Sequence, residues 1–164
     1  MFVLGIDPGL TATGYGLVRR TRIVEAVAAG VIRTDPKADT ASRLLELHRS
    51  LSALIAEHRP QVVAIEQVFT NKNRHSAIGV GRAAGVAMLA AAQSGLKVHE
   101  YAPTMVKSAI TGDGRADKEA VQRMVARRLN LADLPRPADA ADALAVALCH
   151  LQSLAAALEG LGAR

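Results

Sequence analysis

Short apolar runs separated by turn residues open the chain. Three such runs, at residues 2–6, 14–18 and 23–32, predict three β-strands. The second and third are joined by a polar turn near residues 19–22, which favours an antiparallel pair. The pattern then changes, because apolar side chains recur at helical spacing over residues 40–58 until Pro60 interrupts them. A long helix is therefore predicted to follow the three strands.

Strands and helices alternate through the rest of the chain. The predicted elements are a strand over 62–65, a helix of small residues over 76–93, a strand over 97–101, and helices over 104–110, 117–129 and 139–158. No internal repeat and no linker interrupts this order. A strand meander followed by strand and helix alternation predicts an α/β fold, a mixed five-stranded sheet flanked by helices, in a single domain over residues 1–164.

The amino-acid composition indicates which residues form the core and which kind of partner the surface charge favours. Half of the 164 residues are apolar but only 2% are aromatic, so the core must consist mainly of Leu, Val, Ile and Ala. Twenty Lys and Arg residues outnumber fifteen Asp and Glu residues, which gives a net charge of +5. An excess of positive charge favours a polyanionic partner without identifying it.

Several protein classes are excluded by what the sequence lacks. A single cysteine, Cys149, leaves no disulfide framework and no cysteine-cluster zinc site. No run of about 18 uncharged apolar residues is present, so no membrane-spanning segment is predicted. The N-terminal segment has no basic region and meets Asp7 early, unlike a signal peptide. The expected location is therefore the cytoplasm.

Carboxylates directly follow two of the predicted strands. Asp7 comes after the run 2–6, and Glu66 comes after the run 62–65. Ligands and catalytic groups of α/β sheets gather at the carboxyl ends of strands, which favours a shared site. Each acid taken alone also has an ordinary explanation, because Asp7 could open the turn at Pro8-Gly9 and Glu66 could be the first solvated residue after its strand.

A third segment adds two more acids. Asp139 and Asp142 stand three residues apart at the start of the last predicted helix, so both lie on one helical face. The alanines around them would let this helix approach another element closely. Asp139 alone is also explained as a helix N-cap, although a cap needs only one acid. Four carboxylates from three segments suit a hard divalent cation such as Mg²⁺ or Mn²⁺.

The stretches that carry these acids resemble the acidic motifs of one nuclease family. They are Gly5-Ile6-Asp7-Pro8-Gly9, Ala64-Ile65-Glu66-Gln67-Val68-Phe69 and Ala138-Asp139-Ala140-Ala141-Asp142-Ala143-Leu144-Ala145. In order and separation they are similar to those of the bacterial RuvC Holliday-junction resolvases, over residues 2–151. The resemblance implies a ribonuclease-H-like fold and an endonuclease that nicks two strands across a four-way DNA junction in recombination and repair.

The same resemblance implies a site and its partners. Asp7, Glu66, Asp139 and Asp142 would be the catalytic acids that bind two Mg²⁺ ions, with Mn²⁺ as an alternative. Some members carry histidine where Asp139 stands. Two cations would hold the scissile phosphate and stabilise the leaving oxygen, giving 5′-phosphate and 3′-hydroxyl ends. The implied partners are junction DNA, a second copy of the chain in a homodimer, and the RuvA–RuvB branch-migration complex.

A polar and basic stretch after the second acidic motif is predicted to contact DNA. Phe69 is interpreted as a wedge that stacks on an unpaired base, as the resemblance implies, or alternatively as an apolar plug under the loop. The predicted DNA contacts in and after this stretch are Lys72, Asn73, Arg74 and Arg82. A second basic region begins at residue 107. In it, Lys107 and Lys118 match family lysines near the scissile phosphate, where they would neutralise developing charge.

Three glycines interrupt the helix predicted over residues 76–93. Gly79, Gly81 and Gly85 each cost about 1 kcal/mol relative to alanine in a helix interior. Close packing of another helix is therefore expected here, either within the chain or across the two-fold axis of a homodimer.

Three other functions stay open at this point. An actin-like ATPase or sugar kinase also begins with a strand, an aspartate and a Gly/Thr-rich turn, as at residues 7–14, but needs a second lobe for which this length leaves no room. A related nuclease acting on RNA or on other branched DNA would share the acids, and so would a non-catalytic junction-binding protein. Cleavage of duplex, junction and RNA–DNA substrates, assayed beside ATP hydrolysis, would separate these functions.

Overall fold

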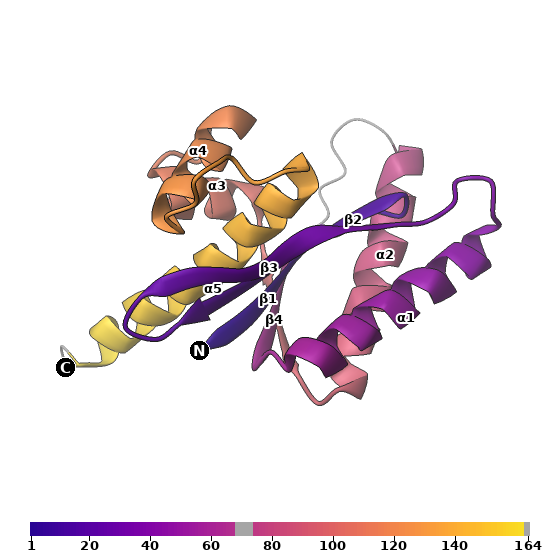
Figure 1. Cartoon of the computed structure of the whole chain (residues 1–164), viewed down its shortest axis with the longest axis horizontal. Coiled ribbons are helices and arrows are strands. Elements are labelled where there is room, and N and C mark those ends of the chain that lie inside the picture. The colour runs from indigo at the N-terminus through magenta and orange to yellow at the C-terminus, as the bar shows by residue number, and fades with distance from the viewer. Residues whose placement is uncertain (68–73, 163–164) are drawn as a thin grey trace.

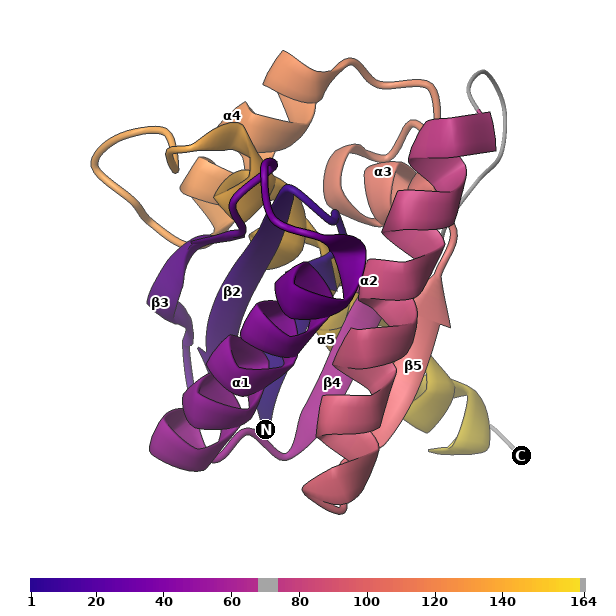
Figure 2. The same ribbon diagram turned by 90° about the vertical axis from the view of Figure 1, so that its right-hand side faces the viewer.

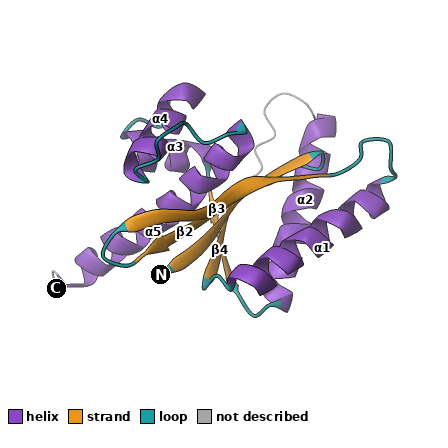
Figure 3. Cartoon of the chain, in the orientation of Figure 1, coloured by secondary structure: helices purple, strands orange, loops and turns teal. Residues whose placement is uncertain are grey.

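Five strands and five helices make up the part of the chain that the structure describes (Figure 3). This computed structural model describes residues 1–67 and 74–162, except for the side chains of 74–76 and 158–162. The strands are β1 (Phe2–Asp7), β2 (Ala12–Arg20), β3 (Val24–Arg33), β4 (Val62–Glu66) and β5 (Lys97–Tyr101). The helices are α1 (Thr40–His58), α2 (Arg74–Gln93), α3 (Pro103–Thr111), α4 (Lys118–Arg128) and α5 (Ala138–Gly162).

The strands form one mixed sheet in the order β3-β2-β1-β4-β5. β1 pairs antiparallel with β2, and β2 pairs antiparallel with β3, as the polar turn between them predicts. β4 lies parallel to β1 on its other side, and β5 lies parallel to β4. The predicted α/β class with a five-stranded mixed sheet is therefore confirmed. Because β1 and β4 are parallel neighbours, their carboxyl ends meet at the same edge of the sheet.

Helices cover both faces of this sheet. α1 and α2 pack on one face, and α3, α4 and α5 pack on the other (Figures 1 and 2). The side chains of β1 alternate between the two layers, as period two requires, because Leu4 and Ile6 join the core under α1 and α2 while Val3 joins the core under α5. All three side chains are fully buried. The aliphatic core expected from the composition is divided by the sheet into two parts.

Helix α1 has the bounds that its periodicity predicts. Asp39 caps its N-terminus, because the Asp39 side chain accepts a hydrogen bond from the Ser42 backbone N–H. Arg59 ends it in the left-handed conformation, at φ 50°, directly before Pro60. The side chains that recur at helical spacing are the ones that are buried, namely Leu47, Leu51 and Ile55.

Helix α5 is the central helix of the core. It packs against all five strands and against α3 and α4. By length and composition alone it is apolar enough over Ala138–Ala157 to cross a membrane, but 61% of this apolar stretch is buried inside the protein. Its side chains from Ala140 to Leu151 are almost all buried. The buried His150 forms a hydrogen bond through Nδ1 with the Tyr101 hydroxyl, at 2.7 Å. α5 is therefore a core helix of this fold.

Glycines on the two central strands admit α5 directly onto the sheet. A Cβ atom at Gly5 would collide with the carbonyl oxygen of Ala143, and one at Gly14 would collide with the carbonyl oxygen of Asp139. A Cβ atom at Gly16 would lie 2.7 Å from the backbone nitrogen of Leu144. Glycine inside a strand often marks such a close approach of another backbone. These positions fix how near the first turns of α5 come to β1 and β2.

A Gly14→Ala substitution should therefore damage stability. The new methyl group meets backbone, which cannot move without shifting Asp139, so we expect a loss of roughly 3 kcal/mol in the free energy of unfolding. Urea titration measures this loss.

Gly79→Ala is the matched stability control for that experiment. A Cβ atom at Gly79 would make only ordinary contact with Leu10, at 3.5 Å, and alanine is the better helix former by about 1 kcal/mol. This variant should be as stable as the wild type or more so. Equal destabilisation by the two substitutions would contradict the close packing of α5 on Gly14.

The glycines of α2 are not closely packed against another helix of the described chain, which is one of the two environments that the sequence predicts for them. A Cβ atom at Gly79 would make ordinary contact with Leu10, at 3.5 Å, whereas one at Gly81 or Gly85 would meet none of the described atoms within 4 Å. Close helix packing inside this chain is therefore the wrong explanation for Gly81 and Gly85. The second explanation, packing across a two-fold axis, stays a prediction.

Candidate active site

Two acids sit at the edge where the central parallel strands end. Asp7 is the last residue of β1 and Glu66 is the last residue of β4. The register pairs Ile6 with Ile65, so the following residue on each strand is an acid. Both side chains are partly buried. The parallel pairing of β1 with β4 thus brings together two carboxylates that are 59 residues apart in the sequence.

The other two predicted acids reach the same edge on α5. Asp139 is the second residue of α5, and Asp142 lies one turn further on, so both project from the same end of the helix. The N-cap interpretation of Asp139 is therefore wrong, because the helix has already begun at Ala138. Ala140, Ala141 and Ala143 are buried at 1% exposure or less, which is the close approach that the alanines predict.

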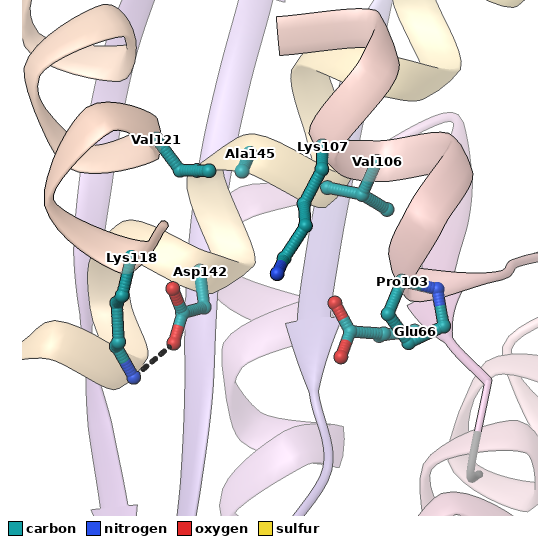
Figure 4. A pocket seen from close by; sticks show the side chains of 8 residues that line it. All are labelled: Glu66, Pro103, Val106, Lys107, Lys118, Val121, Asp142 and Ala145. Atoms are coloured by element: carbon teal, nitrogen blue, oxygen red, sulfur yellow. Dashed lines mark ion pairs between the residues drawn. The ribbon is translucent and has the colours of Figure 1, made fainter. Parts of the chain in front are cut away.

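Three of the four acids lie within reach of one metal ion. One carboxylate oxygen each of Asp7, Asp139 and Asp142 lies within 4.8 Å of the others. Glu66 lies outside this trio and lines an adjoining cavity of about 190 Å³ together with Asp142, Lys107 and Lys118 (Figure 4). The apolar wall of that cavity comes from Pro103, Val106, Val121 and Ala145.

Crowding of negative charge shows in the ionisation of the two strand-end acids. Burial first, and the neighbouring carboxylates second, raise the pKa of Asp7 from 3.8 to about 7. Burial and the charge of Asp142 raise the pKa of Glu66 from 4.5 to about 7, although Lys118 and Lys107 act in the opposite direction. The protein alone supplies too little positive charge to hold both acids ionised at low cost.

Two lysines point into this cluster from the helices above it. The Lys118 Nζ atom lies 2.7 Å from Asp142 Oδ2, and Lys107 points between Asp142 and Glu66 (Figure 4). The hydrogen bond to Asp142 and the surrounding acids raise the pKa of Lys118, so it stays protonated. Lys118 is only partly buried, with its side chain 55% exposed, so an incoming phosphate can reach it.

This donor set fits a hard divalent cation. All the converging side-chain ligands are carboxylate oxygens, which Mg²⁺ and Mn²⁺ prefer, and the site opens to solvent so that water can complete the coordination. Lys118 shows that a cation is already accommodated beside Asp142. Asp7, Asp139 and Asp142 could hold one ion, and Glu66 is placed to add a ligand from the β4 side.

The predicted DNA-contacting residues have different outcomes. Phe69, Lys72 and Asn73 lie outside the described residues. Arg74 is the first residue of α2, and its side chain also lies outside them. Lys107 and Lys118 lie at the acid cluster, while Arg82 is exposed on α2. The strand glycines that seat α5 were not among the predicted functional residues, although glycine within a strand is a signal for close backbone approach.

Known proteins resemble this chain over almost all of its length. The family model described as "Crossover junction endodeoxyribonuclease RuvC" matches residues 3–150. The protein of that name from Salinispora arenicola is 52% identical over 153 residues, which cover 92% of this chain and 87% of that relative. The one from Caldanaerobacter subterraneus subsp. tengcongensis is 48% identical over 154 residues, covering 93% of each chain.

Solved structures give the same result. The Thermus thermophilus RuvC structure superposes with a TM-score of 0.88 at 35% identity, covering 96% of this chain and 97% of that one. T. thermophilus RuvC in complex with a Holliday junction substrate also has a TM-score of 0.88, at 36% identity, covering 94% of each chain. The ribonuclease-H-like fold that the sequence resemblance implies is confirmed by these matches.

Proposed function

Because the chain belongs to the RuvC family of crossover junction endodeoxyribonucleases, we propose that it resolves Holliday junctions by cutting two strands of the four-way DNA. The observation that carries this proposal is the set of carboxylates gathered at one sheet edge from β1, β4 and α5. That site can hold a divalent cation, and two lysines beside it can hold a phosphate. The related structure with a junction substrate supports the choice of DNA.

Asp7, Glu66, Asp139 and Asp142 are the proposed metal-binding catalytic acids. Mg²⁺ is the proposed ion, two per site, with Mn²⁺ as the alternative. When bound, these ions supply an activated water and charge stabilisation at the scissile phosphate. The pKa values of Asp7 and Glu66 are raised to about 7. Protons therefore compete with the metal ion for both carboxylates near neutral pH.

The lysines at the site act on the phosphate itself. Lys107 points into the cavity, and its positive charge lowers the pKa of Glu66. Its ammonium group is therefore placed to attract a phosphate oxygen next to the acids. Lys118 gives up part of its interaction with Asp142 when a phosphate arrives. Positive charge held where negative charge develops lowers the barrier for phosphodiester cleavage.

Cleavage of a mobile synthetic four-way junction, with and without Mg²⁺, tests the proposed function. We expect paired symmetric nicks with 5′-phosphate and 3′-hydroxyl ends in Mg²⁺ and none in EDTA. A linear duplex and an RNA–DNA hybrid of the same sequence should be cut far more slowly. Equal cutting of junction and duplex, or cutting in EDTA, would contradict the proposal, and ATP hydrolysis without nicking would favour the kinase-like alternative.

Two matched nicks call for two active sites, and α2 offers a face for a second copy of the chain. Ile78, Gly81, Gly85, Leu89 and Ala92 recur at helical spacing on the exposed side of α2. Ile78 is 54% exposed and Leu89 is 51% exposed, which is unusual for large apolar side chains. Glycines on such a face let two helices approach closely around a two-fold axis. We propose that this face, the α2 stripe, forms the homodimer interface.

A Leu89→Asp substitution should split that dimer. Placing a carboxylate on each side of a two-fold interface buries two like charges, so the solution mass should fall from about twice 17.2 kDa to 17.2 kDa. The control is Ile23→Asp, which alters an apolar side chain of 65% exposure in the turn at the other end of the sheet. Light scattering after gel filtration measures both. A dimer retained by Leu89→Asp would place the interface elsewhere.

The DNA substrate of the family supports a cytoplasmic location for this protein, and we propose that location. The RuvA–RuvB branch-migration complex is the proposed protein partner. Co-purification of this chain with RuvA and RuvB on a junction, but not on a duplex, would support that partnership.

A further inference from the structure

A second hollow lies beside the active-site edge, on the opposite face of the sheet. It has a volume of about 500 Å³ and is lined by the turn after β1, the start of α1 and one side of α2. Its polar lining includes Gly9, Thr11, Thr40, Arg43 and Arg82. Gly9 follows Asp7 by two residues, so one turn borders both this hollow and the acid cluster. We call it the β1-turn pocket.

Among the described residues, the hydroxyl groups of two threonines hold Arg43 in this pocket. Its Nε atom donates to Thr34 Oγ1 at 2.9 Å, and its Nη2 atom donates to Thr11 Oγ1 at 2.8 Å. Thr34 is buried and donates in turn to the Leu10 carbonyl oxygen at 2.6 Å. This network fixes the guanidinium in one place and leaves the Nη1 donors for another acceptor. Within the described part of the chain, no carboxylate forms an ion pair with Arg43.

The charge in this pocket is uncompensated and positive. Arg82 adds a second guanidinium from α2, and none of the described residues that line the pocket is acidic. Two acids lie close to Arg43 along the chain. Asp39 is occupied at the start of α1, where it accepts from the Ser42 backbone N–H at 3.0 Å, and Glu46 is exposed on α1 and forms no ion pair with Arg43 among the described residues. Gly79 leaves space between α2 and the turn, since its missing side chain would contact Leu10.

We propose that the β1-turn pocket binds a phosphodiester group of the junction DNA, one that is not cut. The proposal rests on the proposed function and adds to it a phosphate subsite on the face of the sheet away from α5. Arg43 and Arg82 bind the phosphate oxygens, since guanidinium donors match a phosphate well. The Thr11 and Thr40 hydroxyls lie on the same lining and are available as further donors. A contact of this kind orients the DNA over the acids without taking part in cleavage.

Salt dependence of junction binding tests this subsite. Affinity is measured in Ca²⁺ across about 50 to 200 mM KCl, where each phosphate contact contributes about 0.9 to the slope of log K against log salt. Because Arg43 and Arg82 share one phosphate, Arg82→Gln and Arg43→Gln should each reduce the slope, and the two substitutions together should reduce it by about 0.9. Arg43→Lys keeps the charge but loses the paired hydrogen bonds to Thr11 and Thr34, so it should keep the slope.

The matched control is Arg22→Gln, in the turn between β2 and β3 at the far end of the sheet. It should leave both slope and cleavage unchanged. Wild-type slopes in Arg82→Gln and Arg43→Gln would overturn the proposal, and so would an equal fall in Arg22→Gln, which would indicate diffuse charge. If Arg43→Lys also reduced the slope of log K against log salt, Arg43 would have a structural role, and the claim that it binds the phosphate would be overturned. Failure of the wild type to prefer junctions would instead refute the proposed function.

Discussion

An Asp7→Asn chain should bind four-way junctions as tightly as the wild type yet cut them on the order of 10³-fold more slowly in Mg²⁺. Asparagine has nearly the same shape as aspartate but lacks the charge and one ligand oxygen. Asp7 contributes to the trio of converging carboxylates, so its loss weakens metal binding at the point where the ions are held. DNA affinity should be retained, because removing an acid from the site lessens its repulsion of phosphate.

The measurement is single-turnover cleavage beside equilibrium binding of the same labelled junction. Glu46→Gln is the matched control, because Glu46 is an exposed acid on α1 with no ion pair among the described residues. It should cut at the wild-type rate. Cleavage by Asp7→Asn at close to that rate would remove Asp7 from the catalytic acids.

The same substitution should make the metal-free protein more stable above neutral pH. A pKa raised in the folded state means that folded Asp7 keeps its proton where the unfolded chain has lost it. Stability therefore falls as pH rises from about 4 to about 7, and the cost is then fully present above pH 7. For a folded-state pKa of about 7 against 3.8, that cost is about 4 kcal/mol. The Tm of Asp7→Asn in EDTA should then exceed that of the wild type by on the order of 10 °C.

His150 has the opposite effect in an overlapping range. Burial lowers the pKa of His150 to about 4, so its contribution makes stability rise with pH between about 4 and 6.5. The contribution of His150 cancels when the Tm of the wild type is subtracted from that of Asp7→Asn, because both chains contain His150. Thermal melts in EDTA from pH 5 to 8 should give two curves that diverge with rising pH, whereas Glu46→Gln should follow the wild type. Parallel curves would contradict an unfavourable Asp7 charge.

Added Mg²⁺ should weaken this pH dependence. The ion binds the folded carboxylates, and at 100 times its Kd it adds about 2.7 kcal/mol of stability. The gain should be larger at pH 8 than at pH 5, because protons compete for Asp7 and Glu66 at the lower pH. In Asp7→Asn the gain should be much smaller at both values.

Local pattern was enough to predict the elements and the acids. α1 was predictable at both ends because a clear helical period begins near Thr40 and Pro60 interrupts it. Asp7 and Glu66 were recognisable because each ends an apolar run, and strand ends are where α/β sheets place their chemistry. The pair Asp139 and Asp142 stood out because only alanines surround it.

Features that depend on contacts between distant segments were not predictable. Nothing local to Gly14 indicates that the carbonyl oxygen of Asp139 lies above it. The network of Arg43 with Thr11 and Thr34 joins three segments and has no sequence signature. The N-cap interpretation of Asp139 failed because α5 begins one residue earlier, at Ala138.

The seating of α5 on β1 and β2 also decides when in its synthesis the protein becomes a nuclease. Asp7 and Glu66 leave the ribosome long before Asp139 and Asp142, and the sheet that holds them is complete in sequence at Tyr101. Until α5 docks on the strand glycines, that sheet edge has half of its carboxylates and cannot assemble the metal trio. A nascent or stalled chain that ends before α5 thus has its strand-end acids in place but lacks the two acids of α5 that complete the cluster.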